Sequence, residues 1–317
     1  MPANLLPNGL VDLLPDMAEK EADTIHHLMK FFKTLGYSRV KPPLIEFEDT
    51  LLQGPGQAIS HHMFQVMDPK SKKMMGVRAD ITPQIARIAA TRYEKSDYPL
   101  RFSYAGDVLH VKGTQLDPTR QFTQVGCELI GDDSIAMDIE CIMTAIQGLK
   151  QIELKDITLD ITLPALLRSI LDEETNKSLF KALENKNKEQ IAEFGGEYSE
   201  LLLALLSMQG DMEQNIQSLQ DLSMPEQAKS ELKRLHDVVS GVKKQLSEQS
   251  IEGVTLTIDP TQHSLFDYHR GVSFTLYTKG VREIIGRGGR YDFDTDQGRD
   301  SAIGFTFYMN PLRKLYK

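Results

Sequence analysis

Polar residues with the spacing of a ligand pocket occur in the segment QFTQVGCELIG at 121–131. Gln124 and Glu128 are four residues apart, so on a strand both side chains lie on one face, with Gly126 between them. The glycine carries no side chain and would leave room for a ligand between an amide and a carboxylate. A solvated sheet face is the alternative, and the spacing alone leaves both interpretations open.

Other segments offer further candidate residues, each with a simpler explanation. Asp80 and Thr82, in RADITPQ, are pocket residues or the N-cap of a following helix. The segment GRGGRYD at 286–292 offers two arginines to a phosphate or a carboxylate, although a tight turn accounts for it equally well. The histidine pairs at 26–27 and 61–62 have neither HExxH spacing nor a cysteine partner. We therefore assign no metal and expect no cofactor.

The elements that position these residues follow from hydrophobic periodicity. The pattern predicts helices over 16–35, 81–95 and 133–152, strands over 63–68, 74–80, 101–113, 121–131, 156–163, 254–259, 266–278 and 281–286, and a glycine-rich turn over 286–292. Residues 165–248 are rich in Leu, Lys and Glu at helical spacing, which predicts an inserted helical block. The order indicates an α+β fold, a mostly antiparallel sheet flanked by helices, forming one domain over 1–317.

Bulk composition excludes several classes of protein. The net charge of −9 argues against a broad nucleic-acid-binding surface. Two cysteines, Cys127 and Cys141, argue against a disulfide scaffold. The first residues do not have the pattern of a signal peptide, and no apolar run approaches the length of a membrane span. We expect a soluble, cytoplasmic protein.

Several ordered segments together resemble the catalytic core of histidyl-tRNA synthetase, a class II aminoacyl-tRNA synthetase. They are NGLVDLLPD, GYSRVKPPLIE (motif 1), VRADIT with RQFTQVGCELIG (motif 2), FDYHRGVSF (usually RGLDYYTG), and GGRYD with SAIGFTFYMNPLR (motif 3). The resemblance spans nearly the whole chain, including the helical insertion at 165–248. It implies a class II synthetase-like core. Because the sequence ends after motif 3, we expect no anticodon-binding domain.

The departures from the synthetase pattern concentrate at the positions that handle ATP. The motif 2 arginine and glutamate fall at His110 and Lys112. A second loop arginine falls at Pro118, the arginine of RGLDYY at Ser264 and the motif 3 arginine at Pro311, whereas Arg120 keeps its place and Arg313 stands two residues late. Losing one fixed donor to a developing charge typically costs roughly 10²–10³ in rate. The resemblance therefore implies a degenerate nucleotide site without catalytic residues.

The amino-acid side of the pocket resembles that of the synthetase more closely. Asp80 takes the place of the glutamate that pairs with the substrate amino group, and Thr82, Gln124, Glu128 and Tyr291 match directly. Of the tyrosine pair in the specificity segment, Tyr268 remains and His269 replaces the second. The resemblance implies that these residues bind L-histidine, with acids on the ammonium group and the Gln124–Glu128 pair on the imidazole.

In combining a lost nucleotide site with a retained amino-acid pocket, the chain resembles the regulatory subunits of ATP phosphoribosyltransferase, which are paralogues of the synthetase. That resemblance implies a non-catalytic protein that binds the short-form catalytic subunit. It would be needed for activity and for feedback inhibition by histidine in the first step of histidine biosynthesis. It also implies a hetero-oligomer that contains a dimer formed through the motif 1 region.

Two alternatives remain open from sequence. One is a truncated synthetase-like enzyme that activates histidine with ATP, and the other is a binding module that uses the fold as a scaffold. Histidine-dependent ATP–pyrophosphate exchange identifies the first, and calorimetry with histidine tests the second.

Overall fold

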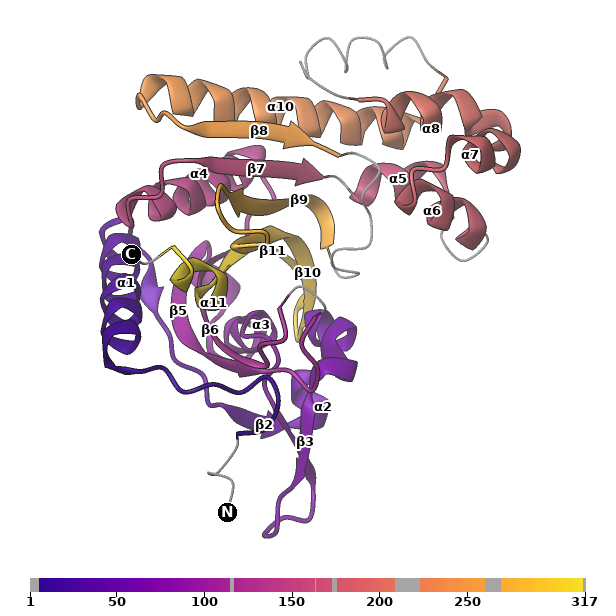
Figure 1. Ribbon diagram of the computed structural model, residues 1–317. Coiled ribbons are helices and arrows are strands. Elements are labelled where there is room, and N and C mark those ends of the chain that lie inside the picture. The colour runs from indigo at the N-terminus through magenta and orange to yellow at the C-terminus, as the bar shows by residue number, and fades with distance from the viewer. Residues whose placement is uncertain are drawn as a thin grey trace.

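The computed structural model describes residues 6–114, 117–162, 164–172, 176–208, 223–259 and 269–315. Ser264 and Tyr268 lie outside these residues, and so does the side chain of His269, whose backbone belongs to a strand. A curved sheet forms the centre of the molecule, with helices on both faces and a block of helices along one end (Figure 1).

The main sheet runs in the order β1-β5-β6-β11-β10-β9-β7-β8. Its strands are β1 (Ser38–Arg39), β5 (Leu100–Leu109), β6 (Gln121–Ile130), β7 (Ile157–Thr162), β8 (Val254–Ile258), β9 (His269–Thr278), β10 (Gly286–Thr295) and β11 (Gly298–Tyr308). Neighbouring strands are antiparallel except at the two edges, where β1 pairs parallel with β5 and β8 pairs parallel with β7. This confirms the expected α+β class with a mostly antiparallel sheet.

Strand β6 shows why the sheet has an apolar face and a polar face. Val125, Cys127 and Leu129 point into the larger hydrophobic core. Gln124 and Glu128, one residue out of phase, point to the opposite face and are nevertheless buried. The period of two therefore sends alternate side chains of a single strand to the core and to a polar site.

Helices α1 (Pro15–Thr34) and α4 (Ile135–Gln151) cover the apolar face of the sheet, and α10 (Glu226–Glu248) packs against α4 and joins the same core. Helix α1 has Pro15 and Asp16 in its first turn and Lys33 in its last, a charge order that complements the helix dipole. It ends before Gly36, whose φ of 87° lies in the left-handed region and stops the helix.

The opposite face of the sheet carries helix α3 (Thr82–Arg92) and a second, smaller core. In Figure 1 strands β5, β6, β11 and β10 curve around α3. The remaining elements near this face are α2 (Glu48–Leu51), η1 (Gly54–His62), η2 (Lys95–Asp97), the C-terminal helix α11 (Met309–Arg313), and a separate three-stranded sheet of β2 (Ile45–Phe47), β4 (Met74–Val77) and β3 (Phe64–Met67).

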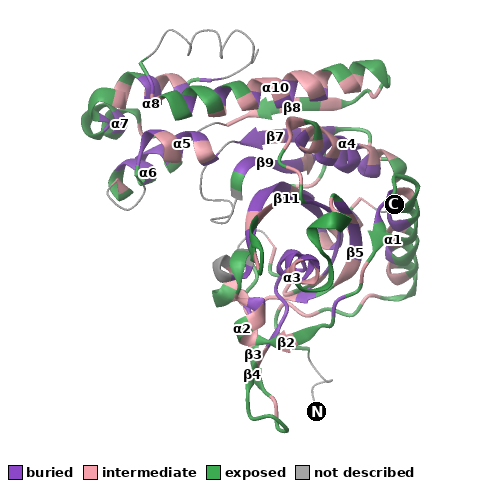
Figure 2. Ribbon diagram, turned by 180° about the vertical axis from the view of Figure 1, so that it is seen from behind, coloured by how far each residue is buried: buried purple, intermediate pink, exposed green. Residues whose placement is uncertain are grey.

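In the described parts of 165–248, all the regular secondary structure is helical. They are α5 (Pro164–Ile170), α6 (Lys177–Glu184), α7 (Lys188–Phe194), η3 (Gly196–Tyr198), α8 (Ser199–Leu206) and α10. Figure 2 shows buried residues on the inner sides of these helices and exposed residues on the outer side of α10. Leu235, Val238 and Val242 of α10 join the same core as α4. The insertion therefore shares its hydrophobic core with the main sheet.

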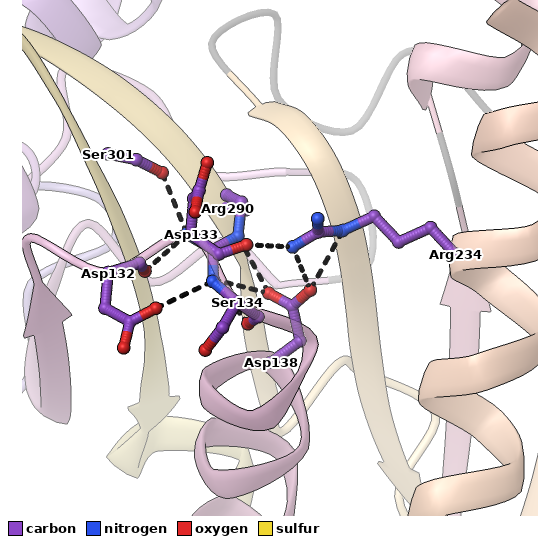
Figure 3. Close-up of polar contacts among 7 residues, drawn as sticks. All are labelled: Asp132, Asp133, Ser134, Asp138, Arg234, Arg290 and Ser301. Carbon is purple, nitrogen blue, oxygen red and sulfur yellow. Dashed lines mark hydrogen bonds and ion pairs between the residues drawn. The ribbon is translucent and has the colours of Figure 1, made fainter.

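A buried carboxylate ties the insertion to the sheet (Figure 3). Asp138 of α4 is fully buried and accepts hydrogen bonds from Arg290 of β10 at 2.8 Å and from Arg234 of α10 at 2.6 Å. The two guanidinium groups also donate to backbone carbonyls, Arg290 to Asp132 and Arg234 to Asp133. One acid thus connects α4, the insertion helix and the strand that carries Tyr291.

The glycine-rich turn predicted at 286–292 is wrong, because these residues form the first part of β10 and pair with both β9 and β11. The glycines serve close packing instead: a Cβ at Gly288 would stand 2.3 Å from the ring of Phe274 on β9. The strand predicted over 281–286 is also wrong, since only Gly286 of that range is in a strand.

One further strand prediction extended too far. The segment DVLHVKG is a strand only to Leu109, because the Val111 amide leaves the ladder and donates to His62. No helix among the described residues is both long enough and apolar enough to cross a membrane.

The Asp138 cluster makes a prediction about stability. Asp138→Asn keeps the shape but removes the charge that two arginines share, leaving a buried cation at Arg290. We expect a loss of about 3 kcal/mol in the free energy of unfolding, measured by urea denaturation. Asp133→Asn, an exposed change just before the same helix, serves as the matched control and should be near neutral. Equal losses in the two variants would contradict this role for Asp138.

Candidate functional site

A cavity of about 830 Å³ opens on the polar face of the main sheet. Its floor comes from β6, β10 and β11, and its walls come from the start of α3, the segment after β5, η1 and α11. Five of the predicted ligand-binding residues line it together: Asp80, Thr82, Gln124, Glu128 and Tyr291. They come from three parts of the chain that are far apart in sequence. Gln124 and Glu128 therefore lie in a pocket and not on a solvated sheet face.

Glu128 lies at the centre of the polar floor. Its Oε1 accepts hydrogen bonds from Thr82 Oγ1 at 3.1 Å and from the Tyr104 hydroxyl at 3.4 Å, and its Oε2 accepts one from the Tyr291 hydroxyl at 3.1 Å. Burial raises the pKa of Glu128 to about 8, with the hydroxyl donors opposing the rise and the Asp80 charge adding to it. A ligand that donates an N–H or carries positive charge would favour the ionised form.

Asp80 and Gln124 form a second polar group beside Glu128, at the start of α3. Both Asp80 Oδ1 and Gln124 Oε1 accept from the amide of Ile81, at 2.8 and 3.1 Å. Burial raises the pKa of Asp80, and hydrogen bonds from Gln124 and the backbone oppose the rise. The N-cap residue of α3 is Ile81, which makes no side-chain cap, and Asp80 accepts from backbone amides at the start of the helix, so Asp80 both contacts the helix start and lines the cavity.

The prediction that Gly126 leaves room for a ligand is wrong. Tyr104 pairs directly across from Gly126, and its hydroxyl lies 2.6 Å from where a Cβ would stand. The glycine therefore admits a tyrosine that hydrogen bonds to Glu128 and, at 2.7 Å, to Thr306 Oγ1. Gly304 has the matching role on β11, because a Cβ there would stand 1.8 Å from Glu128 Oε2.

Sequence reasoning missed Tyr104 and Thr306 as members of this site. The signal that could have identified Tyr104 is an aromatic residue paired with a glycine on the neighbouring strand. That pairing can be recognised only when the register of β5 against β6 is known. The loop that joins the two strands is too long to set that register. Of the remaining predicted residues, Tyr268 and the side chain of His269 lie outside the described residues.

The predicted degenerate nucleotide positions divide between the cavity and other places. His110, Lys112 and Pro311 line the cavity. Pro118 is not among the lining residues, and its carbonyl lies against Gly9 instead. Ser264 lies outside the described residues.

His110 cannot supply the charge that a phosphate needs. Its Nε2 lies 2.9 Å from the carbonyl oxygen of Ala79, an acceptor, so Nε2 carries the proton and donates it. Burial lowers the pKa of His110, so the ring is neutral at physiological pH. Its ring packs against His62 and edge-on against Phe122, with ring centroids 5.1 and 5.0 Å away. This residue builds the wall of the cavity.

Two arginines near the nucleotide positions are committed to structural contacts. Arg120 donates to the carbonyls of His110 and Asn8, and its guanidinium lies over the Phe64 ring. Arg313 forms an ion pair at 3.0 Å with Glu21 of α1. Neither lines the cavity.

Within the described part of the chain, no group of three or more His, Cys, Asp or Glu residues could hold a metal ion. His61, His62 and His110 contact one another through tilted rings, with centroids 4.2 Å apart for the first pair and 5.1 Å for the second.

Comparison with known proteins gives one consistent result. The chain matches a family model described as histidyl-tRNA synthetase over residues 9–312. It is 44% identical over 313 residues to an ATP phosphoribosyltransferase regulatory subunit of Paramagnetospirillum magneticum, covering 97% of this chain and 80% of the relative. A protein of the same name from Gluconobacter oxydans is 36% identical over 314 residues, covering 98% and 80%.

Solved structures agree in fold. An ATP phosphoribosyltransferase regulatory subunit/histidyl-tRNA synthetase from Bacillus halodurans superposes with a TM-score of 0.84 at 24% identity, covering 99% of this chain and 84% of the other. A histidine–tRNA ligase subunit from Alicyclobacillus acidocaldarius gives 0.77 at 22% identity, covering 99% and 98%. At these identities the likeness bears on the fold alone.

The raised pKa of Glu128 predicts a pH-dependent stability. Between the ordinary value of 4.5 and about 8, the folded protein keeps a proton that the unfolded chain has lost, so stability falls as pH rises through this window. Glu128→Gln has no carboxyl group to titrate at this position. The difference in free energy of unfolding between this variant and the wild type should shift in favour of the variant by about 1–3 kcal/mol from pH 5 to pH 8.5. Urea denaturation at both pH values measures this difference. Glu252→Gln, an exposed control, should follow the wild type, and the same pH dependence in Glu128→Gln would refute the assignment.

Proposed function

Because the chain belongs to the ATP phosphoribosyltransferase regulatory subunits, within the histidyl-tRNA synthetase family, we propose that it binds the short-form catalytic subunit of that enzyme and regulates it. The chain is the non-catalytic member, and the partner carries out the phosphoribosyl transfer that begins histidine biosynthesis. We place this complex in the cytoplasm. The partner would require this chain for activity and would receive feedback inhibition through it.

The regulatory ligand in this proposal is L-histidine, bound in the cavity around Glu128. Asp80 and Thr82 would receive the ammonium group, and Gln124 and Glu128 would read the imidazole. The support is chemical: buried acids with neighbouring hydroxyl donors suit a small cationic and N–H-donating ligand. Tyr291 stands beside Glu128, and Tyr268 and His269 complete the proposed set.

One observation carries the choice of regulation over catalysis. Where a nucleotide-activating enzyme needs fixed cations, the cavity has a neutral His110 engaged with a backbone carbonyl and a proline at 311. Stabilising charge on a phosphorus centre depends on such cations. A truncated enzyme that activates histidine with ATP is therefore the weaker proposal.

A physical route from the cavity toward the insertion runs through adjacent residues of β10. Tyr291 donates to Glu128 on one side of the strand, and Arg290 binds Asp138 on the other. Asp138 is shared with Arg234 of the insertion helix α10. We propose that ligand binding at Glu128 shifts the Arg290–Asp138 ion pair. The coupling free energy between the cavity and the insertion would be about 1–3 kcal/mol.

Mixing the chain with a short-form ATP phosphoribosyltransferase tests the function. The two proteins should co-elute, the rate should rise on mixing, and histidine should inhibit the complex. Glu128→Ala should weaken histidine inhibition at least about tenfold while the proteins still co-elute, because a buried ligand contact is lost. Glu252→Gln should behave as the wild type. Failure to co-elute, or histidine-dependent ATP–pyrophosphate exchange by this chain alone, would favour the rival interpretations.

A second surface supports the proposal of a dimer within the complex. The three-stranded sheet places Ile45, Phe47 and Val66 on one face, each between 40% and 45% exposed. The other face is occupied, since Glu46 binds Arg87 and Gln84 of α3. Figure 2 shows this sheet projecting from the body with largely exposed residues. An exposed apolar sheet face in the motif 1 region suits a second copy of the chain.

Phe47→Glu tests this surface by placing a charge at its centre. We expect sedimentation velocity to show a dimer for the wild type and a monomer for the variant, because an unpaired charge cannot be buried at an apolar interface. Leu14→Glu, at another exposed apolar residue outside this sheet, is the matched control and should remain dimeric. A monomeric wild type, or an unchanged Phe47→Glu dimer, would rule the surface out.

A further inference from the structure

Strand β10 sends its two arginines to opposite faces of the sheet. Arg290 points to the helical side, where it binds Asp138. Arg287 is three residues earlier, so the period of two places it on the other face with Gly289 and Tyr291, and all three line the cavity. Arg287 is half-buried there, whereas the other cationic side chains of long reach that line the described cavity, Lys112 and Arg282, are exposed at its rim.

The strand register fixes where Arg287 stands relative to the acids. Arg287 pairs with Thr306 of β11, and Thr306 pairs with Gly126 of β6. Gly126 lies midway between Gln124 and Glu128. With strands about 4.8 Å apart, the backbone of Arg287 is roughly 10 Å from that of Gly126 across the floor. An arginine side chain and a small amino acid can together span this separation.

Arg287 and Asp80 both line the cavity, and the charges of both act on Tyr308, which lines it too. Burial raises the pKa of Tyr308 to about 12, the Arg287 cation opposes that rise, and the Asp80 carboxylate adds to it. The Arg287 cation also opposes the rise that burial causes in the pKa of Tyr277. A cation and an acid that both line the cavity therefore act on the same tyrosine.

A free amino acid needs this arrangement because it carries both charges. Asp80 and Glu128 suit its cationic and N–H-donating groups, but neither offers a positive charge to its carboxylate. His62 and His110 are poor partners for an anion, since burial lowers the pKa of both rings. A guanidinium is suited to a carboxylate, which it can bind through two parallel hydrogen bonds.

We propose that Arg287 binds the carboxylate of the amino-acid ligand and makes the cavity specific for an intact amino acid over its amine or alcohol analogues. The inference rests on the proposed function and adds to it a residue that determines specificity. Arg287 would thereby supply a cation at the amino-acid pocket, where the positions 110 and 311 supply none.

Calorimetry with histidine and histidinol tests this role, because histidinol replaces the carboxylate with a neutral hydroxymethyl group. The wild type should bind histidine about 10- to 100-fold more tightly than histidinol. In Arg287→Gln that ratio should fall to about one, chiefly through weaker binding of histidine. Arg287→Lys, which keeps the charge without the fork of donors, should recover part of the ratio. Arg282→Gln, at the exposed rim, should keep all of it.

The outcomes separate this inference from the proposed function. If the wild type binds histidine but Arg287→Gln keeps the full preference over histidinol, Arg287 is not the carboxylate partner and the proposed function stands. Equal binding of both ligands by the wild type overturns the inference in the same way, without recourse to a variant. If the wild type binds no histidine at millimolar concentration, the proposed ligand and this inference both fall.

Discussion

The buried carboxylate of Asp138 is the contact on which the relation between the three parts of the molecule depends. A charge removed from water must be compensated, and here two arginines from different elements compensate it. One comes from the insertion helix and the other from the strand that forms the cavity floor. Asp138 therefore fixes α10 against α4 and holds β10 in the register that brings Tyr291 to Glu128. Displacing any one of these elements would leave a buried charge without its partner.

The same sheet serves a hydrophobic core and a polar site because side chains alternate along each strand. On β6, Val125 and Cys127 enter the core while Gln124 and Glu128 enter the cavity. The cost of burying polar groups is offset by hydrogen bonds from neighbouring strands and from α3, and glycines give the larger side chains room. Gly304 admits the Glu128 carboxylate and Gly126 admits Tyr104. Small residues in this sheet thus shape the site as much as the charged ones.

The proposed regulatory role uses the cavity of a synthetase-like fold with few changes to its lining residues. Buried acids and hydroxyl groups lie on the floor, while positions 110 and 311 carry a neutral imidazole and a proline. Arg120 and Arg313, which the sequence aligns near those positions, instead hold the N-terminal segment and α1 in place. Binding energy in such a site can be directed into conformational coupling rather than into a chemical step.

The sequence by itself determined the fold class, the helices α1, α3 and α4, and five residues of the cavity, because these follow from hydrophobic period and from ordered motifs. It determined that Gln124 and Glu128 share a face, which needs only the period of a strand. The tertiary structure alone decided which partners they meet. Tyr104 opposite Gly126, the strand at 286–292 and the opposite directions of Arg287 and Arg290 all depend on strand register. Register is set by long-range pairing and by the packing of side chains such as Phe274, and neither is encoded in local periodicity.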